Sequence, residues 1–259
     1  MDSDTNSDIN LETKTTHLPQ IIILYGPPAA GKGTQAHYLQ KILSDYYHLD
    51  FGTELRKFVA LHLGSYNDEL DTINSSSPEN LVVIAKSLKS DMRNSLPAKT
   101  ADLRFVVEQA FVDCISQGKG MLVEGPGRLI EEAEWLSTFF AAHLATVAIF
   151  HLHLDLQKVL DRSVNRYYLP SVKKPFSSFD DAQKSAVEDE KPFQRADDTD
   201  IDGITKRYKL LYSDQFAKII SIYQLIASSL VLTLDASQPV EDVTQEIIEY
   251  LKKFFGFSV

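Results

Sequence analysis

Short runs of apolar, largely β-branched residues alternate along the chain with longer segments in which apolar residues recur at helical spacing. The runs predict five strands, at residues 21–26, 46–51, 121–125, 147–154 and 230–235. Helical periodicity is clearest over residues 34–44, 102–115, 129–140, 157–166, 204–228 and 241–254. Because strands and helices alternate, we expect an α/β protein built on a five-stranded parallel sheet with helices on both faces.

Two stretches interrupt this alternation. Residues 51–98 hold more predicted helix than one crossover needs, and residues 167–195 lack regular patterning. Insertions on a rigid sheet commonly bind substrates or act as lids. At 259 residues the chain suits one domain with insertions, at 19–259, whose core is 19–50, 99–166 and 196–259. The polar and acidic residues 1–18 are expected to form a disordered tail.

Composition narrows the classes of partner. The net charge of −10 argues against a basic face for nucleic acid or for an anionic membrane. A single cysteine, Cys114, argues against a disulfide framework and a cysteine-rich zinc site. The longest apolar run, residues 139–150, contains His143 and is too short to cross a bilayer. We therefore expect a cytoplasmic protein without a nucleic-acid or membrane partner.

The segment "ILYGPPAAGKGTQA", residues 23–36, carries the strongest chemical signal. A predicted strand stops at Gly26, and a helical pattern begins after Lys32, so backbone N–H groups of residues 29–34 can point at phosphate oxygens. Lys32 would reach the outer phosphates, and the Thr34 hydroxyl would lie near Mg²⁺. The strict phosphate-loop pattern has Ser or Thr directly after the lysine, whereas Gly33 intervenes here. The alternative is a glycine-containing turn without a ligand.

The arginines give a second, independent signal. The chain has eight, namely Arg56, Arg93, Arg104, Arg128, Arg162, Arg166, Arg195 and Arg207. Several of these arginines follow the ends of predicted strands or lie on helices that begin at the same edge of the sheet. Arg162 and Arg166 are spaced i, i+4 on one helix face. Since like charges at that spacing destabilise a helix, they indicate a polyanionic ligand; solvated surface charge is the alternative.

These motifs, taken in order, resemble the adenylate kinase family of nucleoside monophosphate kinases over nearly the whole chain after residue 19. "GPPAAGKGTQA" resembles the family's phosphate loop, in which a glycine separates the lysine from the threonine. "LDFGTELR" resembles the segment that binds the acceptor phosphate, and "PAKTADL" resembles the acceptor-base loop. "LVEGPGRLIEEA" resembles the family's Asp-Gly-Phe-Pro-Arg stretch and its base-reading glutamine. "DRSVNR" and "RADDTDIDGITKR" resemble the two hinges of a lid, and "DASQPVEDV" resembles the last loop.

The resemblance implies a three-layer P-loop fold with a monophosphate-binding insertion at 51–98 and a lid at 167–195. It implies these catalytic residues: Lys32, Arg128, Arg162, Arg195 and Arg207. For ATP it implies Ala29, Ala30, Gly31, Lys32, Gly33, Thr34, Arg162, Arg166 and, through its backbone, Gln238. For the monophosphate it implies Phe51, Arg56, Ala98, Gly125, Arg128, Glu132, Arg195 and Arg207. Thr34 and Glu124 would contact Mg²⁺ through water.

The chain departs from the family at several of these positions. Ala29 replaces a customary glycine, Glu124 an aspartate, and "GPGR" replaces "GFPR", while Phe51 stands where a small hydroxyl residue is usual. Glu132 replaces the glutamine that reads adenine. An ionised glutamate can accept from adenine, cytosine or guanine amino groups but cannot donate to adenine N1. The alternative is that Glu132 is an exposed charge on a helix face. The lid has no cysteine, so we expect no zinc.

The expected activity is phosphoryl transfer from ATP to a nucleoside monophosphate by a monomeric enzyme, with AMP as the first expected acceptor. A kinase for GMP or for CMP/UMP is an alternative because of Glu132. So is a nucleotide-binding regulator or assembly factor without turnover, because of the altered "EGPG" stretch and the atypical lid. A phosphate-loop kinase for a small metabolite is a third reading, but it would leave Arg56 and Arg195 without a purpose.

Overall fold

A computed structural model describes residues 18–64, 71–94, 96–187 and 189–256. Of the expected tail at 1–18, only Leu18 lies within the described residues. Five parallel strands form the main sheet in the order β2-β3-β1-β4-β7. Their bounds are β1 Gln20–Tyr25, β2 Tyr47–Asp50, β3 Met121–Glu124, β4 Thr146–His153 and β7 Ser229–Asp235. The predicted five-stranded parallel sheet is confirmed.

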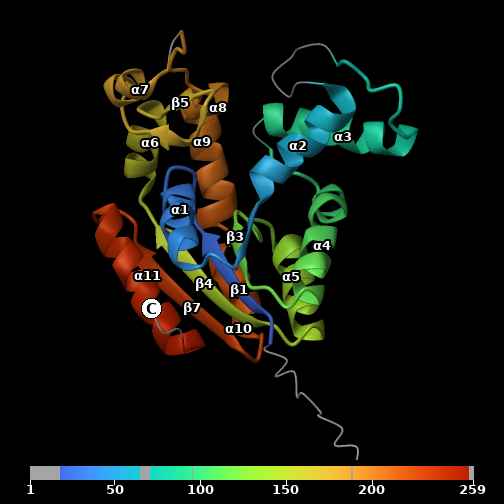
Figure 1. Cartoon of the computed structure of the whole chain (residues 1–259), viewed down its shortest axis with the longest axis vertical. Coiled ribbons are helices and arrows are strands. Elements are labelled where there is room, and N and C mark those ends of the chain that lie inside the picture. Colours follow the sequence, from blue (N-terminus) through green and yellow to red (C-terminus); the bar gives the residue numbers. More distant parts are fainter. Residues whose placement is uncertain (1–17, 65–70, 95, 188, 257–259) are drawn as a thin grey trace, which may run out of the picture.

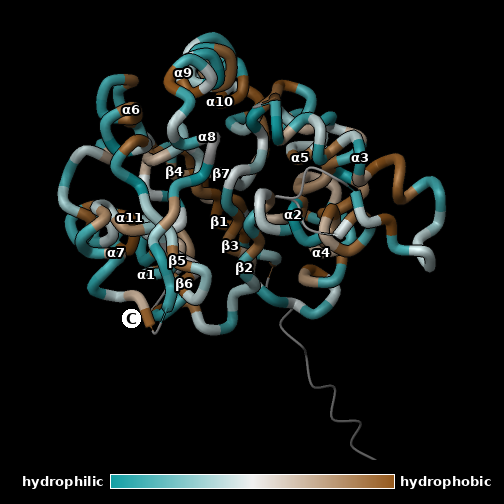
Figure 2. The backbone as a smooth tube through the Cα atoms, turned by 90° about the horizontal axis from the view of Figure 1, so that it is seen from above, coloured by the Kyte–Doolittle hydropathy of each residue, from teal (hydrophilic) through white to brown (hydrophobic). Residues whose placement is uncertain are grey.

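Helices cover both faces of this sheet, which makes three layers (Figure 1). The alternation of side chains along β1 shows why: Ile21 and Ile23 face one buried cluster, and Ile22 and Leu24 face the other. The first cluster lies under α4 (Thr100–Ser116), α5 (Ile130–Ala142) and α10 (Phe216–Gln224). The second lies under α1 (Lys32–Ile42), α6 (Leu156–Val164), α9 (Ile201–Tyr208) and α11 (Val240–Phe255). Figure 2 shows the apolar strands at the centre.

Two groups of elements rise beyond the carboxyl ends of the strands, on opposite sides (Figure 1). One consists of α2 (Phe51–Leu63) and α3 (Glu79–Arg93). The other contains a hairpin of β5 (Tyr167–Leu169) and β6 (Val172–Phe176), with α7 (Phe179–Ser185) and the single turn α8 (Ala196–Thr199). α2 and α3 lie within the stretch 51–98, and β5, β6 and α7 lie within 167–195, whereas α8 follows that stretch; the bounds of the two insertions stay a prediction.

Two stretches differ from what the sequence pattern indicates. The stretch at 167–195, which lacks a regular pattern, contains β5, β6 and α7, and the buried Tyr168 pairs with Phe193 across a bridge. Strands this short are held by such contacts and leave no periodic pattern. The helix expected at 204–228 is broken by a π-helix, η1 (Lys209–Ser213). The Leu211 carbonyl in η1 accepts from the Tyr25 hydroxyl at 3.1 Å, a contact that periodicity cannot record.

Within the described ranges, no helix combines the length and apolar character needed to span a membrane.

Candidate functional site

The loop between β1 and α1 has the backbone that a phosphate site requires. At Gly26, with φ +149°, a Cβ would lie 2.6 Å from the Leu152 carbonyl oxygen, so only glycine fits. Gly31 precedes α1 in the left-handed region at φ +88°. Ala29 also has a positive φ, +59°, where glycine would be unstrained. The first turn of α1 itself contains no acidic residue, so its partial positive charge is available to an anion at the loop.

Lys32 lies folded onto this loop. Its Nζ donates to the Gly26 carbonyl at 2.9 Å and to the Pro27 carbonyl at 2.8 Å. The pKa of Lys32 is lowered to about 8, chiefly by burial; Arg128 and Arg166 also lower it, and the carboxylates of Glu124 and Asp50 raise it. The sequence-predicted residues Lys32, Glu124, Arg128 and Arg166 are therefore close enough to act on one another electrostatically.

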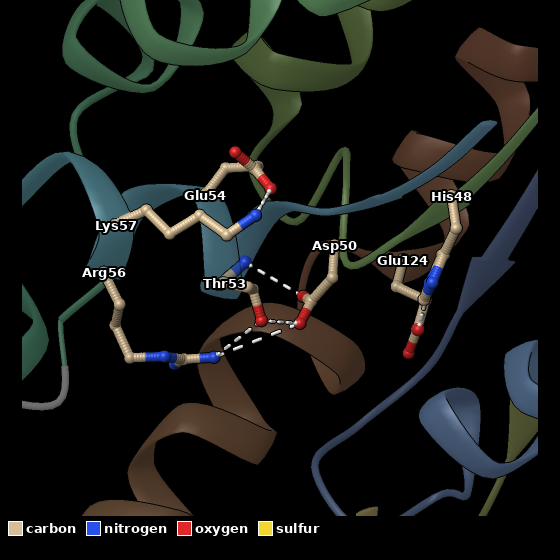
Figure 3. A network of polar contacts seen from close by, with 8 residues as sticks. His48, Asp50, Thr53, Glu54, Arg56, Lys57 and Glu124 are labelled. Atoms are coloured by element: carbon tan, nitrogen blue, oxygen red, sulfur yellow. Dashed lines mark hydrogen bonds and ion pairs between the residues drawn. The ribbon is translucent and has the colours of Figure 1, made fainter. Parts of the chain in front are cut away.

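Glu124 ends β3 beside Asp50, which ends β2 in the same register. Its Oε1 lies 2.6 Å from Nε2 of His48 (Figure 3). Its Oε2 lies toward α1, since a Cβ on Gly33 would be 3.4 Å from it. Gly33, next to which this carboxylate lies, directly precedes Thr34. A carboxylate at this place fits a hard cation that prefers oxygen ligands, such as Mg²⁺. Among the described residues no group of three or more His, Cys, Asp or Glu side chains could hold a metal ion.

Arg56 projects from the first turns of α2, near Asp50 (Figure 3). The Asp50 carboxylate caps α2 by accepting from the Gly52 N–H at 3.0 Å and also accepts from the Thr53 hydroxyl. Arg56 Nη2 lies 3.3 Å from Thr53 Oγ1 and 4.0 Å from Asp50 Oδ2. Arg56 is partly exposed, so it can face an anion, while the Asp50 charge partly offsets its own.

Three other residues predicted for the monophosphate lie around this segment. Phe51 is buried at the start of α2, 6.1 Å from the Phe111 ring, so its side chain belongs to the core. Ala98 is buried just before α4, and Gly125 follows β3 with φ +78°. Contact of these residues with a nucleotide stays a prediction.

The arginines of the predicted lid hinges divide into two groups. Arg162 Nη1 donates to the Ala29 carbonyl at 3.4 Å, which brings it to the phosphate loop. Arg166 binds the buried Asp198 through Nε, at 3.2 Å, and through Nη2. The Tyr168 hydroxyl donates to the same carboxylate at 3.0 Å, and Arg195 lies 4.0 Å over the Tyr168 ring. Arg166 and Arg195 therefore belong to one cluster around Asp198.

Arg128 lies in the loop between Glu124 and α5. Its backbone N–H donates to Glu132 Oε2 at 2.8 Å. Glu132 has no exposed surface, and burial raises its pKa against the opposing charge of Arg128. The alternative that Glu132 is an exposed charge is wrong, because the start of α5 turns this side chain toward Tyr223 of α10.

Two further predicted residues lie on α9 and in the loop after β7. Arg207 lies on α9, and Gln238 lies in the exposed loop between β7 and α11, where its N–H donates to the Asp235 carbonyl at 3.4 Å. Sequence reasoning missed His48, Asp50, Tyr168 and Asp198. Asp198 could have been found, since it stands between Arg195 and Arg207 in an acidic turn.

Comparison with known proteins agrees with this geometry. The chain is 28% identical over 238 residues to the adenylate kinase of Streptomyces avermitilis, covering 90% of this chain and 97% of that protein. It is 27% identical over 241 residues to the adenylate kinase of Methanosarcina barkeri, covering 90% and 99%. It is 25% identical over 244 residues to that of Chlamydia trachomatis serovar D, covering 90% of each. The resemblance to the adenylate kinase family is confirmed.

No family model matches the chain. The adenylate kinase relatives nevertheless extend over both insertions and the three-layer core, so the likeness is not confined to the phosphate loop. Together with the parallel sheet, they support a nucleotide-binding kinase that acts on a nucleoside monophosphate.

Proposed function

We propose that the protein is an ATP:nucleoside monophosphate phosphotransferase that uses AMP as acceptor and forms two molecules of ADP. The observation that carries the proposal is the geometry at one loop: Lys32 donates to the Gly26 and Pro27 carbonyls, Arg162 donates to the Ala29 carbonyl, and the Glu124 carboxylate lies beside Gly33. The names of the relatives favour AMP. The net charge of −10 and the single cysteine are consistent with a cytoplasmic monomer.

The chemistry requires cations more than a base. Bringing a phosphate dianion against a triphosphate costs about 4 kcal/mol for each pair of charges 4 Å apart at an effective dielectric of 20. Guanidinium groups offset this repulsion and can bind phosphate oxygens in pairs. The acceptor phosphate is already ionised near neutral pH, so no general base is needed.

Within this proposal each side chain has a task. The N–H groups of residues 29–34 and Lys32 hold the donor phosphates, with Arg162 reaching over the loop from α6. Arg56 and Arg128 hold the acceptor phosphate, and Arg128, Arg162, Arg195 and Arg207 stabilise the phosphoryl group as it moves. When bound, Mg²⁺ would neutralise charge on the donor phosphates, and Thr34 and Glu124 are the residues that would hold its water ligands.

A coupled assay for diphosphate formation tests the proposal, with Mg-ATP and with AMP, GMP, CMP and UMP supplied separately. We expect turnover with AMP, reduced about 10²–10³-fold in a Lys32→Ala variant, because one charge-stabilising donor is lost. Lys41→Ala, an exposed lysine later on the same helix, is the matched control and should retain turnover. Absence of turnover with all four monophosphates, despite ATP binding, would contradict the enzyme and favour a regulator.

A further inference from the structure

A carboxylate that is sealed from solvent lies behind the loop that carries Arg128. Glu132 is the third residue of α5, and its side chain has no exposed surface. A buried carboxylate is costly unless it is hydrogen-bonded and its charge is compensated. The groups that donate hydrogen bonds to the Glu132 carboxylate and compensate its charge therefore indicate the role of this residue.

Those groups belong to the loop between β3 and α5. Glu132 Oε2 accepts the Arg128 backbone N–H at 2.8 Å. The Arg128 charge and the backbone N–H groups of Gly127 and Leu129 also favour the ionised carboxylate. The first N–H groups of a helix have no partner within it, and a glutamate at the third position can reach back to bind that region. Glu132 thereby fixes the backbone on which the Arg128 side chain stands.

The other side of the carboxylate is closed by aromatic side chains. Tyr223 of α10 is fully buried, and its hydroxyl lies so close to Gly127 that a Cβ there would be 1.9 Å away. Burial and the negative charge of Glu132 both raise the pKa of Tyr223, which places the two groups near one another. Glu132 Oε1 has no hydrogen-bond partner among the described residues and is also inaccessible. In this structure the carboxylate is therefore closed to a ligand.

Arg128 lies in the loop that follows β3, and β3 pairs with β1, the strand that leads into the phosphate loop. The charge of Arg128 contributes to the lowered pKa of Lys32 in that loop. The Nε of Arg128 is buried and has no hydrogen-bond partner among the described residues.

We propose that Glu132 is a positioning residue that acts on phosphoryl transfer through Arg128 and does not contact the acceptor base. The proposal rests on the proposed function. It also means that the choice among adenine, guanine and cytosine is made elsewhere in the site.

Substitutions of Glu132 separate positioning from base recognition. Glu132→Gln keeps an oxygen for the Arg128 N–H but removes the charge, whereas Glu132→Ala removes both. We expect kcat to fall about tenfold or more in Glu132→Ala with every acceptor that the wild type uses, and less in Glu132→Gln. The ratios of kcat/KM among AMP, GMP and CMP should stay within about twofold of the wild type in both. Glu134→Gln, an exposed glutamate one half-turn later, should match the wild type.

A double-mutant cycle with Arg128→Ala tests whether Glu132 acts through Arg128. In that background Glu132→Ala should lower kcat by no more than about twofold, because the group that it positions is gone. Two results would overturn the proposal. One is a tenfold change of acceptor preference in Glu132→Gln. The other is a fall of kcat on adding Glu132→Ala to Arg128→Ala that is as large as the fall that Glu132→Ala causes in the wild type.

Amide hydrogen exchange at Arg128 gives a readout that does not need turnover. We expect this amide to exchange about tenfold faster or more in Glu132→Ala and to stay protected in Glu132→Gln. If the wild type has no turnover, the proposed function fails, and the exchange still shows whether Glu132 holds the loop. Unchanged exchange in Glu132→Ala would overturn the positioning role even in an active enzyme.

Discussion

Lys32 shows what sequence spacing can and cannot reveal about a single residue. Its place after a glycine-containing turn and before a helix was enough to assign it to the phosphate loop. Spacing carries no information about its pKa, and an exposed lysine is protonated at any physiological pH. The structure shows instead a lysine folded onto the Gly26 and Pro27 carbonyls, with a pKa lowered to about 8 chiefly by burial. Burial of this kind depends on neighbours far along the chain.

This pKa predicts how ATP binding depends on pH. Below pH 8 Lys32 is charged in the free protein, and it loses its proton as the pH rises through about 8. Since the triphosphate binds the charged form, the Kd for ATP should rise above pH 8 by up to about tenfold per pH unit. Lys32→Arg stays protonated over this range and should bind ATP with a flat profile. Calorimetric titrations between pH 7 and 9.5 measure this, and equal slopes in both proteins would contradict it.

Glu132 is a single residue whose burial could not be predicted from the local sequence pattern. A glutamate in the first turn of a helix is usually exposed, and the helical pattern of residues 129–140 gave no reason to expect otherwise. Its burial is caused by α10, which packs against α5 and carries Tyr223. A contact between elements so distant in the chain leaves no mark in the local pattern. The resemblance assigned Glu132 to the acceptor base, and it could not show that the side chain is buried.

Among the elements, the strands of the main sheet could be predicted from the sequence. The break between α9 and α10 and the β5–β6 hairpin could not. Each buried strand is a continuous apolar run because both of its faces are covered. The break between α9 and α10 and the hairpin of β5 and β6 depend on tertiary contacts, at Leu211 and at Tyr168 respectively. Short segments of that kind fall below the length at which periodicity is informative.

The departure "GPGR" is explained by the packing of two elements. Gly127 has φ +65°, and the Tyr223 hydroxyl occupies the space in which its side chain would lie. The glycine in the loop before α5 and the tyrosine on α10 therefore form one packing unit. The change at this stretch marks a repacked loop, and it removes neither the Arg128 backbone contact nor the turn.

Gly127→Ala should destabilise the protein by about 2–4 kcal/mol, from left-handed strain together with overpacking against Tyr223. In a Tyr223→Phe background the same substitution should cost about 1 kcal/mol less, because the hydroxyl is gone while the strain remains. Urea unfolding of the four proteins measures both values. Gly118→Ala is the matched control, since Gly118 has the same φ of +65° and nothing within 4 Å of an added Cβ. If Gly127→Ala lowers the free energy of unfolding no more than Gly118→Ala does, Tyr223 does not fill this space.

At the scale of the molecule, the two insertions stand on opposite sides of the carboxyl edge of the sheet (Figure 1). One carries Arg56, and the other includes Arg195 at its end. Two opposing effects then govern how ATP and AMP influence each other. Their phosphates repel by about 4 kcal/mol per pair of charges at 4 Å. Closure of both insertions over the phosphates would bring arginines to both ligands and offset that repulsion.

We predict that closure prevails and that the two nucleotides bind cooperatively. A coupling free energy of about 1–2 kcal/mol would tighten AMP binding roughly 5–30-fold in the presence of a non-transferable ATP analogue. Linkage requires the analogue to bind tighter by the same factor when AMP is present, which provides an internal check. Arg195→Ala should weaken the coupling more than it weakens either nucleotide alone, because in the proposed function Arg195 stabilises the phosphoryl group that passes between the two nucleotides. Calorimetric titration of each ligand with and without the other measures these factors. Independent or mutually weakened binding would mean that charge repulsion, not closure, dominates the site.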